Sequence, residues 1–288
     1  MSEPRPPIPE ETKREVRQRC HFGCVFCGLP VYEYDHIEEW AEVHSHDPSQ
    51  ITLLCPTHHA EKSRGLRTRE QVSAANDSPF NRGRGITAPY GLHFGGAAAV
   101  SMNIGTDSFR STSHLFPIVI DNWPVVAFIR DGSEIGLWLD LVDELNLPRV
   151  IIRNNELVMR SDAWDITFEG QRLTVRDDRG RVFLRIRFTP PASITIERAR
   201  ILKNGVWIEV FPSEVRIANS VRMSGNRWDG EMGFTVGYCP DFIQPIGFLR
   251  FHTPRFGSEV LGLLRGPALN ADEEPDSGED GSDVRGGA

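Results

Sequence analysis

The stretch "CPTHHAEKSRG" (residues 55–65) combines a cysteine, two adjacent histidines and a basic run. Upstream, "CVFC" supplies Cys24 and Cys27, and 27 residues separate this pair from Cys55. Two knuckles of this kind, C-x2-C and C-x2-H, are typical of the closed tetrahedral zinc sites that stabilise small domains. The spacing therefore predicts a structural Zn²⁺ with four ligands, namely Cys24, Cys27, Cys55 and His58.

The placement of the cysteines supports metal rather than disulfides. Four of the five cysteines lie between residues 20 and 55. Clustering of this kind in a chain without a secretory leader is typical of metal binding. Cys20 is the competing zinc ligand, and its alternative role is that of a packed thiol. Cys239 stands alone in an apolar context, which predicts a small buried hydrophobic residue.

The segment between the knuckles, "YEYDHIEEW" (residues 32–40), carries a resemblance. The series Cys-x2-Cys, Asp-His-Ile and Leu-Leu-Cys-x2-His-His-x2-Lys resembles the zinc-containing HNH endonucleases, which have the ββα-metal fold. The match covers roughly residues 20–65. It implies that Asp35 and His59 bind a catalytic divalent ion and that His36 is the general base. Adjacent residues of a helix project about 100° apart, so His58 and His59 are expected to serve different metals.

The implied chemistry suits these residue types. A neutral imidazole can deprotonate water near neutral pH, and a cation stabilises the charge that develops on the scissile phosphate. Mg²⁺ or Mn²⁺ is the expected catalytic ion, because Asp35 and His59 leave most of its coordination shell to water and phosphate oxygens. Gln50 stands where the family has an asparagine that pins the loop, and its amide offers the same donors and acceptor. The loop residues His44 and His46 are expected to be exposed to solvent.

A basic run, "EKSRGLRTRE" (residues 61–70), follows the second knuckle. Beside a phosphodiesterase site, such cations would contact phosphates and give affinity without sequence specificity. The alternative is an ordinary solvated basic face. The residues expected to contact nucleic acid are Lys62, Arg64, Arg67 and Arg69.

Beyond residue 90 the pattern becomes that of strands. In "RVFLRIRF" (residues 181–188) apolar residues alternate with arginines, as on a half-buried strand. Asn204-Gly205 is a strong hairpin signal, and further strand-like runs recur at short spacing. These signals predict a mainly antiparallel all-β domain, with a sandwich favoured over a β-solenoid. The stretch "SEIGLWLDLVDELN" (residues 133–146) also fits a helical period.

The sequence therefore predicts an α+β chain in four parts. Residues 1–70 form the zinc-containing nuclease domain, 71–90 a linker, 91–268 a β-rich domain that targets or regulates it, and 269–288 a disordered acidic tail. The net charge of −8 is concentrated at the C-terminus, since residues 271–288 have one arginine against seven acids. Most of the negative charge thus lies outside the part expected to bind DNA.

The expected function is that of a DNA endonuclease, in a setting such as restriction, phage defence or a mobile element. The alternative is a non-catalytic zinc-folded module that binds DNA or protein, for which Gln50 is the best support. A ligand or protein partner is a further candidate role of the β-rich domain. No apolar run reaches the ~18 residues of a membrane span, and the N-terminus has prolines and acids in place of a leader. A cytoplasmic protein without a membrane partner is therefore expected.

Overall fold

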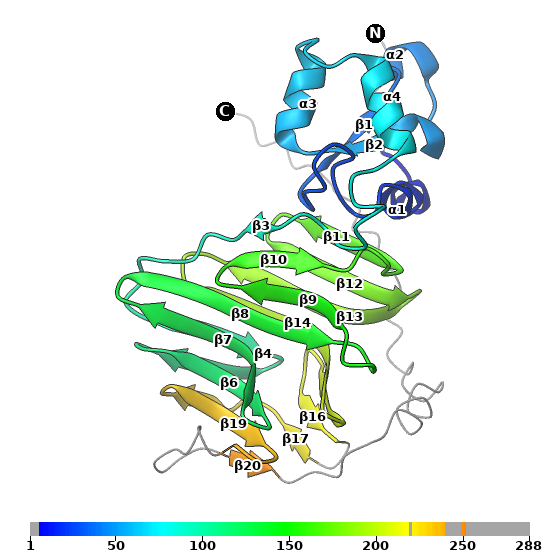
Figure 1. The fold of residues 1–288 in the computed structure, drawn as a ribbon. Coiled ribbons are helices and arrows are strands. Elements are labelled where there is room, and N and C mark those ends of the chain that lie inside the picture. The colour runs from blue at the N-terminus through cyan, green and yellow to red at the C-terminus, as the bar shows by residue number, and fades with distance from the viewer. Residues whose placement is uncertain (1–5, 219–220, 240–248, 252–288) are drawn as a thin grey trace, which may run out of the picture.

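The computed structural model describes residues 6–218, 221–239 and 249–251 (Figure 1). A small N-terminal unit of helices and one hairpin stands at one end of a much larger β-rich unit (Figure 1). The predicted acidic tail, residues 269–288, lies outside the described residues. In the described part of the chain, no helix has the length and apolar character needed to cross a membrane.

The N-terminal unit contains one two-stranded antiparallel sheet, in which Asp35 lies opposite Thr52. The second strand leads directly into a helix, whose first residue, Pro56, has the backbone angle that suits a helix start. The elements of this unit are α1 (Glu10–Arg19), β1 (Glu33–His36), α2 (Trp40–Val43), the 3-10 helix η1 (Pro48–Gln50), β2 (Ile51–Leu54), α3 (Pro56–Ser63) and α4 (Arg69–Asp77).

The segment expected to be a linker, residues 71–90, begins inside helix α4. Thr68 caps this helix by accepting a hydrogen bond from the backbone of Gln71, whose side chain accepts one from the backbone of Thr68. The rest of the segment packs on the turn that carries Cys24 and Cys27, because the buried Asn81 amide donates to the carbonyl of Gly28 at 3.1 Å. The two units are therefore joined by packed chain, with a helix where the sequence suggested a flexible connection.

The β-rich unit contains two sheets. The first has the strand order β20-β19-β6-β7-β8-β9-β10-β3, and the second runs from β11 to β17 in sequence order, with β4, β5 and β18 attached through β14. Its strands are β3 (Tyr90–Gly91), β4 (Val100–Ile104), β5 (Asp107–Ser111), β6 (Leu115–Ile120), β7 (Trp123–Asp131), β8 (Glu134–Val142), β9 (Pro148–Arg153), β10 (Glu156–Met159), β11 (Asp165–Glu169), β12 (Arg172–Asp178), β13 (Arg181–Thr189), β14 (Ser193–Lys203), β15 (Val206–Val210), β16 (Val215–Ile217), β17 (Val221–Met223), β18 (Arg227–Asp229), β19 (Met232–Val236) and β20 (Leu249–Phe251).

The main core lies between these sheets and contains buried side chains from both, such as Leu139 of β8 and Ile186 of β13. The chain is thus mainly β and sandwich-like, and the described strands form no closed barrel. The hairpin expected at Asn204-Gly205 is confirmed, with β14 and β15 on either side of it and positive φ angles of 49° and 75° at the two residues.

The helical alternative for residues 133–146 is wrong, since β8 occupies most of this stretch. Its leucines alternate toward the core, with Leu137, Leu139 and Leu141 all buried. Pairing with β7 on one side and β9 on the other satisfies the backbone of β8. The two-residue spacing of these leucines, together with pairing to strands on both sides, outweighs the helical spacing that the apolar residues of this stretch also fit.

The junction between the units is formed by α1 and the region around β11. Gln18 donates to the carbonyl oxygen of Trp164 at 2.6 Å, and the guanidinium of Arg14 lies 4.8 Å from the centre of the Trp164 ring. The Tyr32 hydroxyl, from the segment before β1, donates to the carbonyl oxygen of Ile166 at 3.3 Å. These contacts fix the N-terminal unit on the end of the β-rich unit.

Candidate metal centre and active site

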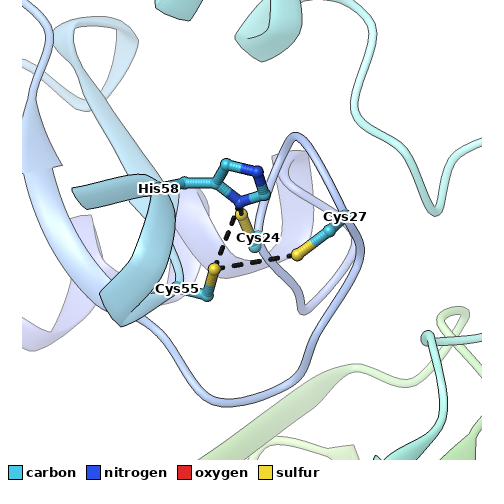
Figure 2. A group of neighbouring side chains, drawn as sticks. All are labelled: Cys24, Cys27, Cys55 and His58. Carbon is cyan, nitrogen blue, oxygen red and sulfur yellow. Dashed lines mark hydrogen bonds between the residues drawn. The ribbon is translucent and has the colours of Figure 1, made fainter. Parts of the chain in front are cut away.

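Three thiols and one imidazole meet beside the start of α3 (Figure 2). The Nδ1 atom of His58 lies 3.3 Å from Cys24 Sγ and 3.2 Å from Cys55 Sγ, and Cys27 Sγ lies 3.7 Å from Cys55 Sγ. All four ligand atoms lie within 4.8 Å of one another. The expected grouping of the two knuckles is confirmed.

The cluster has the dimensions of a zinc site. Two thiolates on a tetrahedral Zn²⁺ stand about 3.8 Å apart, and a thiolate and an imidazole nitrogen about 3.5 Å apart. The measured sulfur–sulfur separation of 3.7 Å matches, and the sulfur–nitrogen separations of 3.2 and 3.3 Å are a few tenths of an ångström shorter. A metal such as zinc can therefore bind here with little movement of the ligands.

The thiols of Cys24 and Cys27 affect each other's ionisation. The hydrogen bond from Cys27, followed by backbone hydrogen bonds, lowers the pKa of the Cys24 thiol against the opposing effect of burial. The same hydrogen bond raises the pKa of Cys27. Since a thiolate is the species that binds metal, binding of a metal at this cluster would be accompanied by release of thiol protons.

The remaining cysteines of the described chain stand apart from this cluster. Cys20 Sγ lies 4.0 Å from the Thr52 hydroxyl and 3.7 Å from the Asn76 side-chain oxygen, and burial raises the pKa of its thiol. Cys20 is thus a packed thiol and not the fourth ligand. Cys239 is buried against Val119 and Met232, which confirms its expected role in packing.

His59, next to His58, points to a different group of residues. Its Nε2 lies 3.4 Å from Asp35 Oδ1, and its Nδ1 lies 3.3 Å from Glu33 Oε2. Asp35 and Glu33 are two residues apart on β1, so they share one face of the strand. The fold thus brings the side chains of Asp35 and His59 together beside β1.

Lys62 lies one helical turn beyond His59 and contacts the same strand. Its ammonium donates to Asp35 Oδ2 and to the backbone carbonyl of His36. The two oxygens of Asp35 are thereby divided, with Oδ2 toward Lys62 and Oδ1 toward His59. An ion at Asp35 and His59 would consequently use one oxygen of this carboxylate.

The imidazole of His36 is buried next to Asp35 and contacts two rings from the segment between β1 and β2, those of Trp40 and His46. Its ring centre lies 5.6 Å from that of Trp40, and its Nε2 lies 3.2 Å from Nδ1 of His46. His46 was expected to be exposed, but its ring is half-buried and stacks on Trp40 with the centres 4.5 Å apart. His44 is exposed, as expected.

Asp47 is one of the residues that hold the loop between β1 and β2, together with Arg19, whose guanidinium donates to the carbonyl oxygens of Pro48 and Ile51. The Asp47 carboxylate accepts a hydrogen bond from the backbone of Ser49 at 2.9 Å, and this bond lowers the pKa of Asp47. Gln50 contributes through its backbone. Its backbone carbonyl oxygen accepts a hydrogen bond from the backbone N–H of Ile37 at 2.8 Å, and its backbone N–H donates to the carbonyl oxygen of Asp47. The loop is thus pinned by backbone groups and by Asp47, three residues before the position that the resemblance assigned to this task.

The four cations of the basic run differ in their surroundings. Lys62 is held at Asp35, the Arg67 guanidinium binds Glu61 and lies over the Phe26 ring, and Arg69 binds Glu38 and Glu42. Arg64, at the end of α3, is exposed. Three of the four therefore already neutralise carboxylates, which leaves Arg64 as the most accessible cation of the run.

Three residues near the site were not found from the sequence. Glu33 could have been noticed, because it alternates with Asp35 on a short strand. The roles of His46 and Asp47 depend on how the β1–β2 loop folds back, and no local spacing signals that. No family model, curated protein or solved structure matches this chain.

Proposed function

We propose that the N-terminal unit is an HNH-type endonuclease that hydrolyses DNA phosphodiester bonds with a divalent ion and is stabilised by structural zinc. The observation that carries the proposal is the pairing of Asp35 Oδ1 with His59 Nε2 at 3.4 Å beside His36, while His58 faces the thiols. Two adjacent histidines thus serve two separate groups of ligands. The hairpin of β1 and β2 followed by α3 is the order of elements expected for a ββα-metal unit.

The side chains divide the work as follows. Asp35 and His59 would hold the ion, and the Glu33 carboxylate lies 3.3 Å from Nδ1 of His59, which leaves Nε2 as the ligand atom. When bound, Mg²⁺ or Mn²⁺ would supply positive charge to the scissile phosphate. His36 would accept the proton of the attacking water. Lys62 would hold the Asp35 side chain in place, and Arg64 would contact the DNA backbone.

In this proposal the β-rich unit targets or restrains the nuclease. Its edge strand β11 contacts helix α1, and α1 in turn packs on β2 of the proposed active-site hairpin. A non-catalytic binding module remains the second candidate function. Lys62 favours it, since its ammonium already supplies Asp35 with a cationic partner. The two candidate functions differ in whether a divalent ion can bind beside the Asp35 carboxylate when the Lys62 ammonium is already there.

Incubation of supercoiled plasmid with the full chain in Mg²⁺, in Mn²⁺ and in EDTA tests the proposal. Nicking or linearisation that requires the ion and is lost in Asp35→Asn is expected of the nuclease. Absence of cleavage by a folded, zinc-loaded chain under every metal condition would favour the binding module. DNA mobility-shift measurements on the same samples would then show whether binding remains.

A further inference from the structure

The loop after β1 places a second imidazole directly behind His36. Nε2 of His36 lies 3.2 Å from Nδ1 of His46, and Nε2 of His46 lies 2.9 Å from the backbone carbonyl oxygen of Pro6. The His46 ring stacks on Trp40 at an angle of 29°, which fixes its plane. The end of β1, the loop that follows it and the N-terminal segment at Pro6 therefore meet in one line of hydrogen bonds.

The chemistry of these groups sets the position of each proton. A carbonyl oxygen can only accept, so Nε2 of His46 must carry the hydrogen that reaches Pro6. In neutral imidazole the other nitrogen then holds a lone pair, so Nδ1 of His46 is an acceptor. Nε2 of His36 must consequently donate to it. The lone pair of neutral His36 is thereby assigned to Nδ1.

We propose that His46 is a positioning residue that holds His36 in the tautomer with the proton on Nε2 and the lone pair on Nδ1. The proposal rests on the function inferred above, in which His36 accepts a proton from water. A base in the opposite tautomer would present an N–H group in place of a lone pair. His46 also fixes the orientation of the His36 ring, because a ring flip would break the hydrogen bond between the two imidazoles.

Two substitutions separate this role from simple packing. His46→Phe keeps an aromatic ring on Trp40 but removes both nitrogens. His46→Asn loses the ring but can place its amide oxygen where Nδ1 now accepts from His36. If His46 acts by accepting the proton of His36, Asn retains the effect and Phe loses it. A purely structural role would give the opposite order.

The test is imidazole nitrogen NMR on the full chain labelled with ¹⁵N-histidine, at about pH 8, where an ordinary imidazole is neutral. Wild type and His46→Asn are expected to show His36 with its proton on Nε2 and a large separation between its two nitrogen shifts. In His46→Phe the separation should narrow as the tautomers mix. Plasmid cleavage should fall on the order of tenfold in His46→Phe and be largely restored in His46→Asn.

Two results would overturn the assignment. One is a wild-type spectrum with the His36 proton on Nδ1, and the other is a His46→Phe variant with unchanged nitrogen shifts and cleavage. The spectrum is independent of activity. A wild type that shows the expected tautomer but does not cleave DNA would retain the imidazole pair and remove the nuclease proposal.

Discussion

The guanidinium of Arg17 on α1 binds both carboxylate oxygens of Asp165 on β11, with Nε–Oδ1 at 2.7 Å and Nη2–Oδ2 at 2.9 Å. Both side chains are buried, with exposed fractions of 3% and 5%. Burial alone would lower the pKa of Arg17, but the hydrogen bonds to Asp165 raise it above its usual value. The remaining nitrogen of the guanidinium donates to the Tyr34 hydroxyl at 2.6 Å. The β-rich unit is thus connected to the strand that carries Asp35.

Removal of one member of this buried pair should destabilise the chain strongly. We expect Asp165→Ala to lower the free energy of unfolding by about 3–5 kcal/mol, because it leaves an uncompensated buried guanidinium. Glu11→Gln is the matched control, since Glu11 pairs with Arg14 at the surface of the same helix and should change stability by less than about 1 kcal/mol. Urea titration of both variants measures the difference. Equal effects would show that the buried pair does not secure the junction.

Loss of the metal cluster should unfold the N-terminal unit and spare the β-rich unit. Cys55→Ser should abolish stoichiometric zinc binding, because structural zinc contributes on the order of 10 kcal/mol to folding of small domains. Cys20→Ala should keep one zinc per chain, since its thiol lies outside the cluster. Elemental analysis with circular dichroism checks both variants. Full zinc content in Cys55→Ser would refute the ligand set.

Glu33 should affect the second metal through His59. Glu33→Gln is expected to weaken Mn²⁺ binding by about 10–100-fold, because the partner of a metal-bound imidazole sets its orientation and basicity. Glu38→Gln serves as the comparison, since Glu38 belongs to the same segment but pairs with Arg69. Calorimetric titration with Mn²⁺ gives the affinities. Unchanged affinity in Glu33→Gln would mean that His59 needs no such support or does not bind the ion.

Arg64 should carry a phosphate contact. Arg64→Gln is expected to weaken DNA binding evenly across sequences and to reduce the slope of log affinity against log salt by about one. Arg64→Lys retains the charge and should keep the wild-type slope. Fluorescence anisotropy at several salt concentrations measures both. The same slope in all three proteins would place the DNA elsewhere.

The sequence predicts best what depends on local spacing. Cys24 and Cys27 lie on one short turn, and Cys55 and His58 lie about one helical turn apart, so local spacing brings the two members of each pair together. The alternation of apolar and charged residues along β13 likewise predicts a strand, and Asn204-Gly205 predicts a hairpin turn. Contacts formed by folding over long distances leave no such local signal.

The pair of Arg17 and Asp165 illustrates that limit, because 148 residues separate its members. His46 reaches His36 only because the loop bends back over Trp40, and a loop histidine without that contact would be exposed. The helix α4 was hidden for another reason. Most of its residues are polar or small, and they resemble a linker until the cap at Thr68 and the packing of Val72 are considered.

The most direct test of the account is cleavage of supercoiled plasmid by His36→Ala in Mg²⁺, beside wild type and His44→Ala. His44 follows α2 in the segment between β1 and β2 and is exposed, so its variant controls for the loss of a nearby histidine. We expect His36→Ala to bind zinc and Mn²⁺ normally and to lose ion-dependent nicking, while His44→Ala cleaves as wild type does. Normal cleavage by His36→Ala would contradict the assignment of the base and of this site as a nuclease centre.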